Sequence, residues 1–573
     1  MPALIGKKFS VFNANTFASS FVSDSIYLYL GKVLVWPDDE DNPPAPEDTP
    51  KYHNEIWDKM AGLVRVTKNQ VSLGISRVNW TSGSKYGQYH HANTSLGDYY
   101  ILAGVNDRDV YKCLDNNGES PSTSKPTHKN LGISREPDGY AWKYMYTIPD
   151  TQFKKFATDT VIPVMQDRDV AEASRSNRVI HLPISANNTL GVGGFYRGLG
   201  FVNSSYSTAS SNATVFTTVS ANASTNEIKV IADNGLAIQA NYYNNSAFYI
   251  TSGVAAGTYR KILTSKAGAK STGVDAGYVD DKASNLVLSS VVSNIANGDT
   301  FIIGPMITLQ EAGGGSGFLA IGNTNRYGNV TSIDVSLTGL GYSNGSSNAT
   351  INGDYHPTSN GLVDGSGADV EFTIPPAGGH GSNIASELEA KYVIVAPETP
   401  VVKDHETGKF VGYGNDFRQV GLVRNPISAR SGFIAYESMY DLKTTLYFQS
   451  PTYLKFKKDQ RVYNTLAEGS ERASGIVYNV CGDSPHQYLS LVDVRGQFAN
   501  GDIIYNRLGD SASISGVSLA NHQYPSSSQN PPISSVVNSD VAKYTGEIIY
   551  HENISPITRR LDQKEQFKFI FEF

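Results

Sequence analysis

The chain has 573 residues, of which 40% are hydrophobic and 18% are charged, and its formal net charge is -7. A chain of this length can bury several hydrophobic cores, so we expect three or four folded domains. The negative charge argues against a nucleic-acid-binding surface as the main function, because phosphate binding requires a basic surface.

Cysteine content and the N-terminal residues indicate the compartment. Cys113 and Cys481 are the only cysteines, which excludes a disulfide framework and favours folding in a reducing compartment. Residues 1–8 contain no apolar run long enough for a signal peptide or a membrane span. We therefore expect a soluble protein that is made in the cytosol.

Residues 1–190 predict mixed α/β structure. A short helix is expected after the capping residues 13–15, and the clearest helix is expected over 54–67. The pattern over 54–67 consists of four apolar residues at helical spacing: Ile56, Met60, Leu63 and Val64.

Strands and a loop are expected between these two helices. Residues 26–30 and 33–36 predict two strands that flank a turn at Gly31. The acidic, proline-rich residues 38–50 predict an exposed loop, and another short helix is expected after Asp150.

Residues 77–149 are dense in aromatic side chains, which bury a large area per residue and suit packing or contact surfaces. Alternation over 140–146 predicts a strand with its aromatic residues on one face. We interpret this face as core or subunit interface, with a sugar-stacking platform as the alternative. The candidate packing or interface residues are Trp80, Tyr86, Tyr89, Tyr111, Tyr140, Trp142, Tyr144 and Tyr146.

The composition changes near residue 190, where Gly, Ser, Asn and Thr become dominant and helical periodicity disappears. We expect one or two small all-β modules over 191–379 and another over 471–530, inserted into a host domain. The sequence Ala-Asn-Gly-Asp occurs at 296–299 and again at 499–502, each time before an apolar run. Asn-Gly between such runs favours tight hairpins.

The host domain is expected to resume after residue 379 and to end in an alternating strand over 566–573. Such a strand is expected to dock into a sheet of this subunit or of a neighbour. Its candidate packing residues are Phe569, Phe571 and Phe573.

The predicted fold class is therefore mainly β with a few short helices: an α+β, β-sandwich-like host domain with inserted small all-β modules. The predicted segments are the host domain over 1–190, the inserted modules over 191–379, the resumed host over 380–470, a small inserted module over 471–530 and C-terminal host strands over 531–573.

No catalytic, cofactor-binding or metal-ligating set is expected. His90 and His91 would point to opposite faces of a strand, and no further ligand stands at a suitable spacing. His380 lies between glycines that permit positive φ, so we expect its ring to bond the turn backbone. No Lys-Ser/Thr follows the glycines of 313–317, which argues against a phosphate-binding loop.

Acidic residues are further candidates for a site. Residues 38–41 are interpreted as a solvated loop in preference to a cation site. Asp107 with Asp109, and Asp280 with Asp281, are acidic pairs of the kind that glycosidases use, but such pairs are common in loops.

Several blocks of the sequence resemble one family. Residues 77–89, 105–118 and 138–149, the turn around Gly378, Gly379, His380 and Gly381 with Glu387 after it, and residues 546–563 are similar to the baseplate wedge subunit of T4-type contractile-tailed phages, the gene-product-eight family. The blocks stand in the same order as in that family. The T4 member is much shorter and lacks the modules, whose pattern resembles the expanded versions in phages of cyanobacteria.

This resemblance implies a non-enzymatic structural subunit of a bacteriophage tail, located in the virion baseplate after assembly in the host cytoplasm. Its implied partners are a second copy of the chain, as a homodimer, and other baseplate wedge subunits. No cofactor, nucleic acid or membrane is implied. A peripheral binding protein whose inserted modules recognise host-surface glycans is the alternative, and a tail-associated depolymerase is a third reading, for which the sequence offers no motif.

Overall fold

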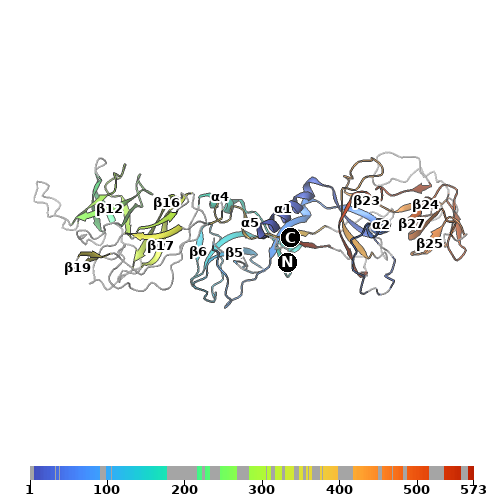
Figure 1. The fold of residues 1–573 in the computed structure, drawn as a ribbon, viewed down its shortest axis with the longest axis horizontal. Coiled ribbons are helices and arrows are strands. Elements are labelled where there is room, and N and C mark those ends of the chain that lie inside the picture. The colour runs from blue at the N-terminus through green and yellow to red at the C-terminus, as the bar shows by residue number, and fades with distance from the viewer. Residues whose placement is uncertain are drawn as a thin grey trace, which may run out of the picture. The chain divides into compact units, whose positions relative to one another are not determined.

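The described part of the chain is mainly β with few helices, which confirms the predicted fold class (Figure 1). The computed structural model describes residues 6–31, 34–37, 39, 41–90, 99–104, 106–176, 216–221, 226–232, 246–266, 283–304, 306–311, 316–324, 330–340, 347–352, 356–358, 361–363, 375–376, 378–397, 417–448, 455–466, 469–481, 487–514, 535–556 and 566–573.

The chain divides into two compact units. Unit 1 comprises Met1–Ile75, Thr151–Pro163 and Ala390–Phe573, and unit 2 comprises Ser76–Asp150 and Val164–Glu389. The units do not divide at the composition change near residue 190, because residues 76–150 group with the module region. The helices of the described residues are α1 (Lys7–Ser23), α2 (Pro50–Lys59), the 3-10 helix η1 (Lys68–Gln70), α3 (Asp150–Phe156), α4 (Arg168–Ser176) and α5 (Ile384–Glu387).

Among its described residues, unit 1 contains three sheets. The first, in spatial order, is β23 (Met439–Asp441), β2 (Met60–Arg65), β1 (Ile26–Gly31), β22 (Gln419–Arg424) and β31 (Glu547–Asn553). The second is β32 (Phe569–Glu572), β21 (Tyr392–Val395), β3 (Val71–Ser76) and β8 (Val161–Pro163). The third is β29 (Ser511–Ser513), β28 (Ile503–Tyr505), β25 (Arg461–Tyr463), β26 (Ala473–Cys481), β27 (Gln487–Gly496), β24 (Thr444–Phe448) and β30 (Val536–Val537).

Among its described residues, unit 2 contains two four-stranded sheets, a closed barrel and a two-stranded sheet. The first four-stranded sheet is β4 (Tyr100–Leu102), β5 (Asp109–Asp115), β7 (Ala141–Thr147) and β6 (Ile133–Arg135). The barrel is β10 (Glu227–Ala232), β13 (Ala283–Leu288), β12 (Tyr259–Lys266), β11 (Ala247–Ile250), β14 (Thr300–Gly304) and β9 (Phe216–Ala221). The second four-stranded sheet is β17 (Val330–Leu340), β16 (Ser316–Thr324), β15 (Met306–Glu311) and β18 (Ser347–Asn352). The two-stranded sheet is β19 (His356–Thr358) with β20 (Gly361–Val363).

The helix expected over 54–67 is confirmed for residues 54–59 and is wrong for the residues that follow. Helix α2 begins earlier, after Thr49, whose side chain accepts a hydrogen bond from Tyr52 N at 3.2 Å, and it ends at Lys59. Residues 60–65 form β2 instead, with Leu63 in one core cluster and Val64 in another. A strand that is buried on both faces has no period-2 pattern, so its apolar run fits a helical template equally well.

The other N-terminal predictions had mixed outcomes. The strand over 26–30 is confirmed as β1, and the short helix after Asp150 is confirmed as α3. Residues 34–36 form no strand. Helix α1 begins at Lys7, so residues 13–15 lie inside it and do not cap it; there Asn15 Nδ2 donates to Val11 O at 2.8 Å.

The two Ala-Asn-Gly-Asp sequences form the same turn. Asp299 Oδ2 accepts from Ala296 N and Asp502 Oδ2 accepts from Ala499 N, both at 2.8 Å. The glycines have φ of +91° and +85°, which a residue with a Cβ rarely adopts. The hairpin prediction is wrong at both places, because β14 pairs with β11 and β9, and β28 pairs with β25 and β29.

The strands around these turns repeat one topology. The barrel order β10-β13-β12-β11-β14 recurs in unit 1 as β24-β27-β26-β25-β28, with antiparallel pairing and the same order along the chain. The Ala-Asn-Gly-Asp turn precedes the fifth strand in both. The second copy therefore begins at β24, before the residue 471 at which the sequence places the small module.

Candidate functional site

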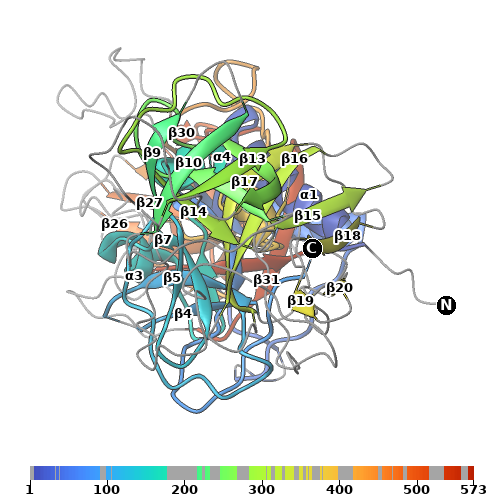
Figure 2. The same ribbon diagram turned by 90° about the vertical axis from the view of Figure 1, so that its left-hand side faces the viewer.

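The sheet β4-β5-β7-β6 contains most of the aromatic candidates. Figure 2 shows β4, β5 and β7 side by side, and residues 109–115 of β5 and 141–146 of β7 are buried throughout. Their antiparallel register aligns Tyr111 with Tyr144, Lys112 with Lys143, and Cys113 with Trp142. Side chains of both faces are therefore covered by other parts of the chain.

One aromatic group surrounds Trp142. The rings of Tyr140 and Trp142 are stacked at 5.5 Å, and the ring of Tyr86 meets that of Trp142 edge-on at 5.9 Å. Tyr140 and Trp142 have no exposed area. The Tyr140 hydroxyl donates to Ser120 O at 2.6 Å, and half-buried Trp80 donates from Nε1 to Ser122 Oγ at 3.1 Å. Tyr86, Tyr140 and Trp142 are core residues while Trp80 is half-buried, and the buried rings offer no open face for stacking a sugar.

A second aromatic group lies around Tyr111. Its hydroxyl donates to His128 O at 2.7 Å, and its ring meets that of Tyr144 edge-on at 5.8 Å. The expected alternation over 140–146 is interrupted, because Val110 pairs with Tyr146 whereas the next residue, Tyr111, pairs with Tyr144. The extra residue, Met145, puts Tyr146 out of phase with Tyr144, whereas Tyr144 and Trp142 stay in phase on the strand. Both tyrosines are nevertheless buried.

The C-terminal candidates pack inside unit 1. Strand β32 pairs with β21, so the terminal strand docks into a sheet of this chain. Phe569 is buried, while Phe571 and Phe573 are half-buried and contact the ring of Phe17 on α1 at 5.1 and 5.4 Å. The prediction of a docked C-terminal strand is confirmed, with this subunit as its site.

An ion pair is buried in unit 2 between β5 and the segment around α5. Lys112 Nζ lies 2.7 Å from Glu387 Oε1, and the two side chains are 1% and 3% exposed. His380 Nδ1 lies 2.6 Å from the same oxygen, and Gly381 N donates to Oε2 at 2.6 Å. The ring of Tyr89 covers the Lys112 ammonium at 4.1 Å and meets the imidazole edge-on at 5.0 Å. We call Lys112, Glu387, His380 and Tyr89 the buried ionic cluster.

The predicted hydrogen-bond partner of the His380 ring is wrong. Its ring bonds the Glu387 carboxylate and not the turn backbone, and because a carboxylate only accepts, Nδ1 carries the proton. The predicted positive φ is confirmed for Gly378, Gly379 and Gly381. Gly381 is further required by space, since a Cβ there would lie 2.4 Å from Val170 Cγ1 of α4.

The charges in this cluster shift one another's pKa values. Burial alone would raise the pKa of Glu387, but the Lys112 ammonium and the His380 hydrogen bond lower it to about 2. Burial lowers the pKa of Lys112, which the Glu387 carboxylate opposes. Burial also lowers the pKa of His380, which keeps the imidazole neutral near pH 7.

The lowered pKa of Glu387 predicts that the protein loses stability in acid. The ordinary pKa of glutamate is 4.5, so as the pH falls the unfolded chain binds the proton before the folded chain does. The contribution of Glu387 to the free energy of unfolding is therefore complete above pH 4.5 and is lost as the pH falls towards 2. Unfolding by urea between pH 5 and pH 3 should show this loss in the wild type and a flatter profile in Glu387→Gln. Parallel profiles for the two proteins would contradict the prediction.

The buried ionic cluster can stabilise the fold, but a substrate cannot reach it. Glu387 is already bonded by three groups, and Lys112 and Glu387 are almost fully buried. Perturbed pKa values can mark a catalytic site, but here they arise from burial and mutual pairing. We therefore interpret the cluster as the contact that holds the 378–389 segment on β5.

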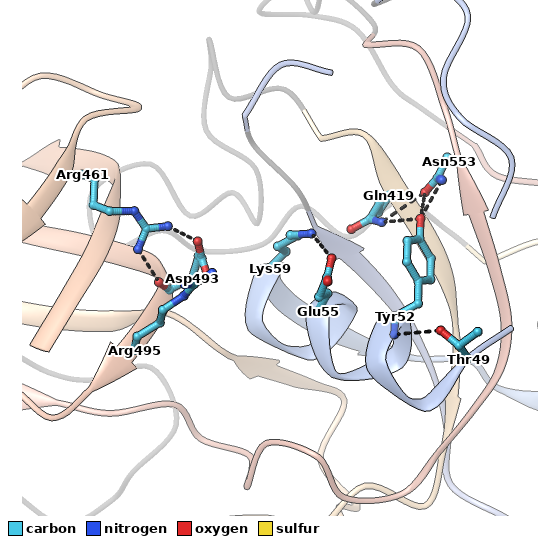
Figure 3. A network of polar contacts seen from close by, with 9 residues as sticks. All are labelled: Thr49, Tyr52, Glu55, Lys59, Gln419, Arg461, Asp493, Arg495 and Asn553. Atoms are coloured by element: carbon cyan, nitrogen blue, oxygen red, sulfur yellow. Dashed lines mark hydrogen bonds and ion pairs between the residues drawn. The ribbon is translucent and has the colours of Figure 1, made fainter. Parts of the chain in front are cut away.

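A second polar network lies in unit 1 around α2 (Figure 3). The Tyr52 hydroxyl bonds Asn553 Oδ1 at 2.9 Å and accepts from Gln419 Nε2 at 3.2 Å, while Asn553 Nδ2 donates to Pro44 O at 2.9 Å. This network joins α2, β22, β31 and the 41–49 loop. In the same view, Asp493 of β27 pairs with Arg461 of β25 and with Arg495 of its own strand.

No family model and no curated protein matches this chain.

The remaining chemical candidates do not converge on a site within the described residues. Asp39 accepts from Asp41 N and Asn42 Nδ2, so its carboxylate closes its own turn. Asp107 pairs with Lys125 and Asp109 pairs with Lys129, so each carboxylate is bound by a different cation. The described residues contain no group of three or more His, Cys, Asp or Glu placed to hold a metal, and none of their helices is long and apolar enough to cross a membrane.

Several candidates lie outside the described residues or are only half described. His91, Asp280, Asp281 and most of 313–317 lie outside them, and His90 lies in irregular structure, so the strand assumed for it is wrong. The buried ionic cluster itself was missed. Lys112 and Lys143 alternate with aromatic residues on adjacent strands, a pattern that normally indicates a solvent-facing side.

Proposed function

We propose that this protein is a non-enzymatic structural subunit of the baseplate wedge of a contractile-tailed bacteriophage. One observation carries the proposal: three blocks that resemble the wedge family and that are separated along the chain, 77–89, 105–118 and the turn that precedes Glu387, meet within unit 2. Tyr89, Lys112 and Glu387 come from three of these blocks and form the buried ionic cluster.

Further contacts between these blocks support the same reading. Asn116 Nδ2 donates to Tyr86 O at 3.1 Å, and Asn117 Nδ2 donates to Asp138 O at 3.0 Å. The polar side chains of the blocks are used to hold the blocks to one another, and the aromatic side chains fill the space between them. Such a body transmits force and holds neighbours in register without transforming a substrate.

A subunit of this kind would act through its surfaces. The rigid sheets would keep contact loops at constant spacing, while interfaces repack when the tail contracts. We further propose that the chain forms a homodimer, for which light scattering of the purified chain should give twice 62.0 kDa.

The decisive experiment is an image reconstruction of the intact tail of the virus that encodes this chain. The chain should account for density in the baseplate, between neighbouring wedge subunits. Its absence from the tail tip would overturn the proposal. Shortening of a host polysaccharide by the purified chain would also overturn it, in favour of a depolymerase.

A further inference from the structure

The loop between β22 and β23 in unit 1 exposes large apolar side chains in an ordered backbone. The exposed fractions of the side chains are 76% for Phe433, 51% for Ile434 and 64% for Tyr436. Tyr544, which follows β30 in the chain, is 54% exposed. Thr545 Oγ1 accepts from Ile427 N at 3.0 Å, which places the Tyr544 backbone beside the loop, and the Tyr544 hydroxyl donates to Asp58 Oδ1 of α2 at 2.6 Å. Single exposed apolar residues are ordinary, but a contiguous group of them marks an interaction site.

The loop closes on itself. Ser428 N donates to Phe433 O and Gly432 N donates to Ser428 O, both at 2.9 Å, and Ile427 and Ile434 form an antiparallel bridge. Gly432 has φ +70°, which allows the reversal at the tip. A tip held by these bonds keeps Phe433 at a defined position.

The loop is also tied to the body of unit 1. Ala429 N donates to Asp540 O at 2.8 Å, the Tyr440 hydroxyl accepts from Tyr436 N at 3.0 Å, and Arg65 Nη1 donates to Tyr436 O at 2.7 Å. Ala435 is fully buried in the core cluster beneath. The exposed side chains are therefore preorganised, so a partner that binds them orders little additional backbone.

The charges of the loop and its surroundings indicate that the partner is a protein. Arg430 is exposed at the tip and makes no ion pair within the described residues. Aromatic residues with an arginine are the composition of protein–protein hot spots. The loop also lies close to negative charge, because Asp540 interacts electrostatically with Asp441 and Glu437. This group of carboxylates disfavours an anionic lipid surface as the partner of the loop.

We propose that residues 427–436, with Tyr544, form a docking loop for another folded protein. Its binding surface carries an apolar pocket for Phe433 and Ile434 and a carboxylate that faces Arg430. The docking loop itself does not depend on the proposed function, but the expectation that the partner is a tail protein and the measurement of incorporation into the particle rest on it.

Photo-crosslinking in the full-length chain tests the proposal. p-Benzoylphenylalanine is introduced at position 433 and, as a matched control, at position 508, because Phe433 and Leu508 are both 76% exposed in unit 1. In cells that assemble the native particle, position 433 should crosslink to an apolar pocket of one other protein, and position 508 should not. Arg430→Glu should reduce that crosslink roughly tenfold, and reversal of the facing carboxylate to lysine should restore it.

Substitutions give an independent measurement. Phe433→Ser should fold as the wild type does, because the side chain is exposed, yet should lower incorporation into the particle roughly tenfold, whereas Leu508→Ser should not. Crosslinks to this chain, to a second copy or to lipid would overturn the proposal. Insensitivity to Arg430→Glu, or equal incorporation of the two serine variants, would also overturn it. A partner that is not a tail protein would refute the proposed function and leave the docking loop standing.

Discussion

Glu387→Ala is expected to destabilise unit 2 by about 3–5 kcal/mol, because it leaves the Lys112 ammonium buried without its anion. Native-state hydrogen exchange of β5 and β7 amides should report the loss locally, and the fluorescence of buried Trp142 should report the unfolding of the sheet. The loss is expected to be large because Lys112 has no route to water in this fold.

Two variants make this result specific. Glu172→Ala removes the exposed pair with Arg168 in the same unit and should change stability by less than about 0.5 kcal/mol. Lys112→Met together with Glu387→Gln removes the ion pair without an unpaired charge and should recover much of the loss. Equal effects of Glu387→Ala and Glu172→Ala would refute the role of the buried ionic cluster.

Deletion of residues 569–573 is expected to unfold much of unit 1 at ambient temperature. The deletion removes β32 from the edge of β21 and removes three phenylalanines that pack against α1 and Tyr550. Loss of one buried phenylalanine commonly costs about 3–5 kcal/mol, and whole domains are stable by only about 5–15 kcal/mol.

Calorimetry of the truncated chain would measure this effect. Glu572→Gln supplies the control, since it keeps the strand and removes only the exposed pair with Lys391, and it should melt close to the wild type. A truncated chain with the wild-type unfolding transition would show that the terminal strand contributes nothing to the fold.

Turn chemistry and strand composition were predictable because they depend on neighbouring residues. Gly378, Gly379 and Gly381 have the positive φ that their sequence predicts, and β1 and α3 lie where the pattern places them. The helix over 54–67 failed for a physical reason. Residues 60–65 pack on both faces, and the sequence holds no record of which neighbours will cover them.

The sequence by itself determined that this protein is β-rich, that glycines form its turns, and that its aromatic residues are used for packing. Only the tertiary structure decided that Lys112 pairs with Glu387, 275 residues later, and that the exposed-looking face of β5 is covered. Local conformation follows from each residue and its neighbours, whereas a long-range ion pair exists only after the chain has closed around it.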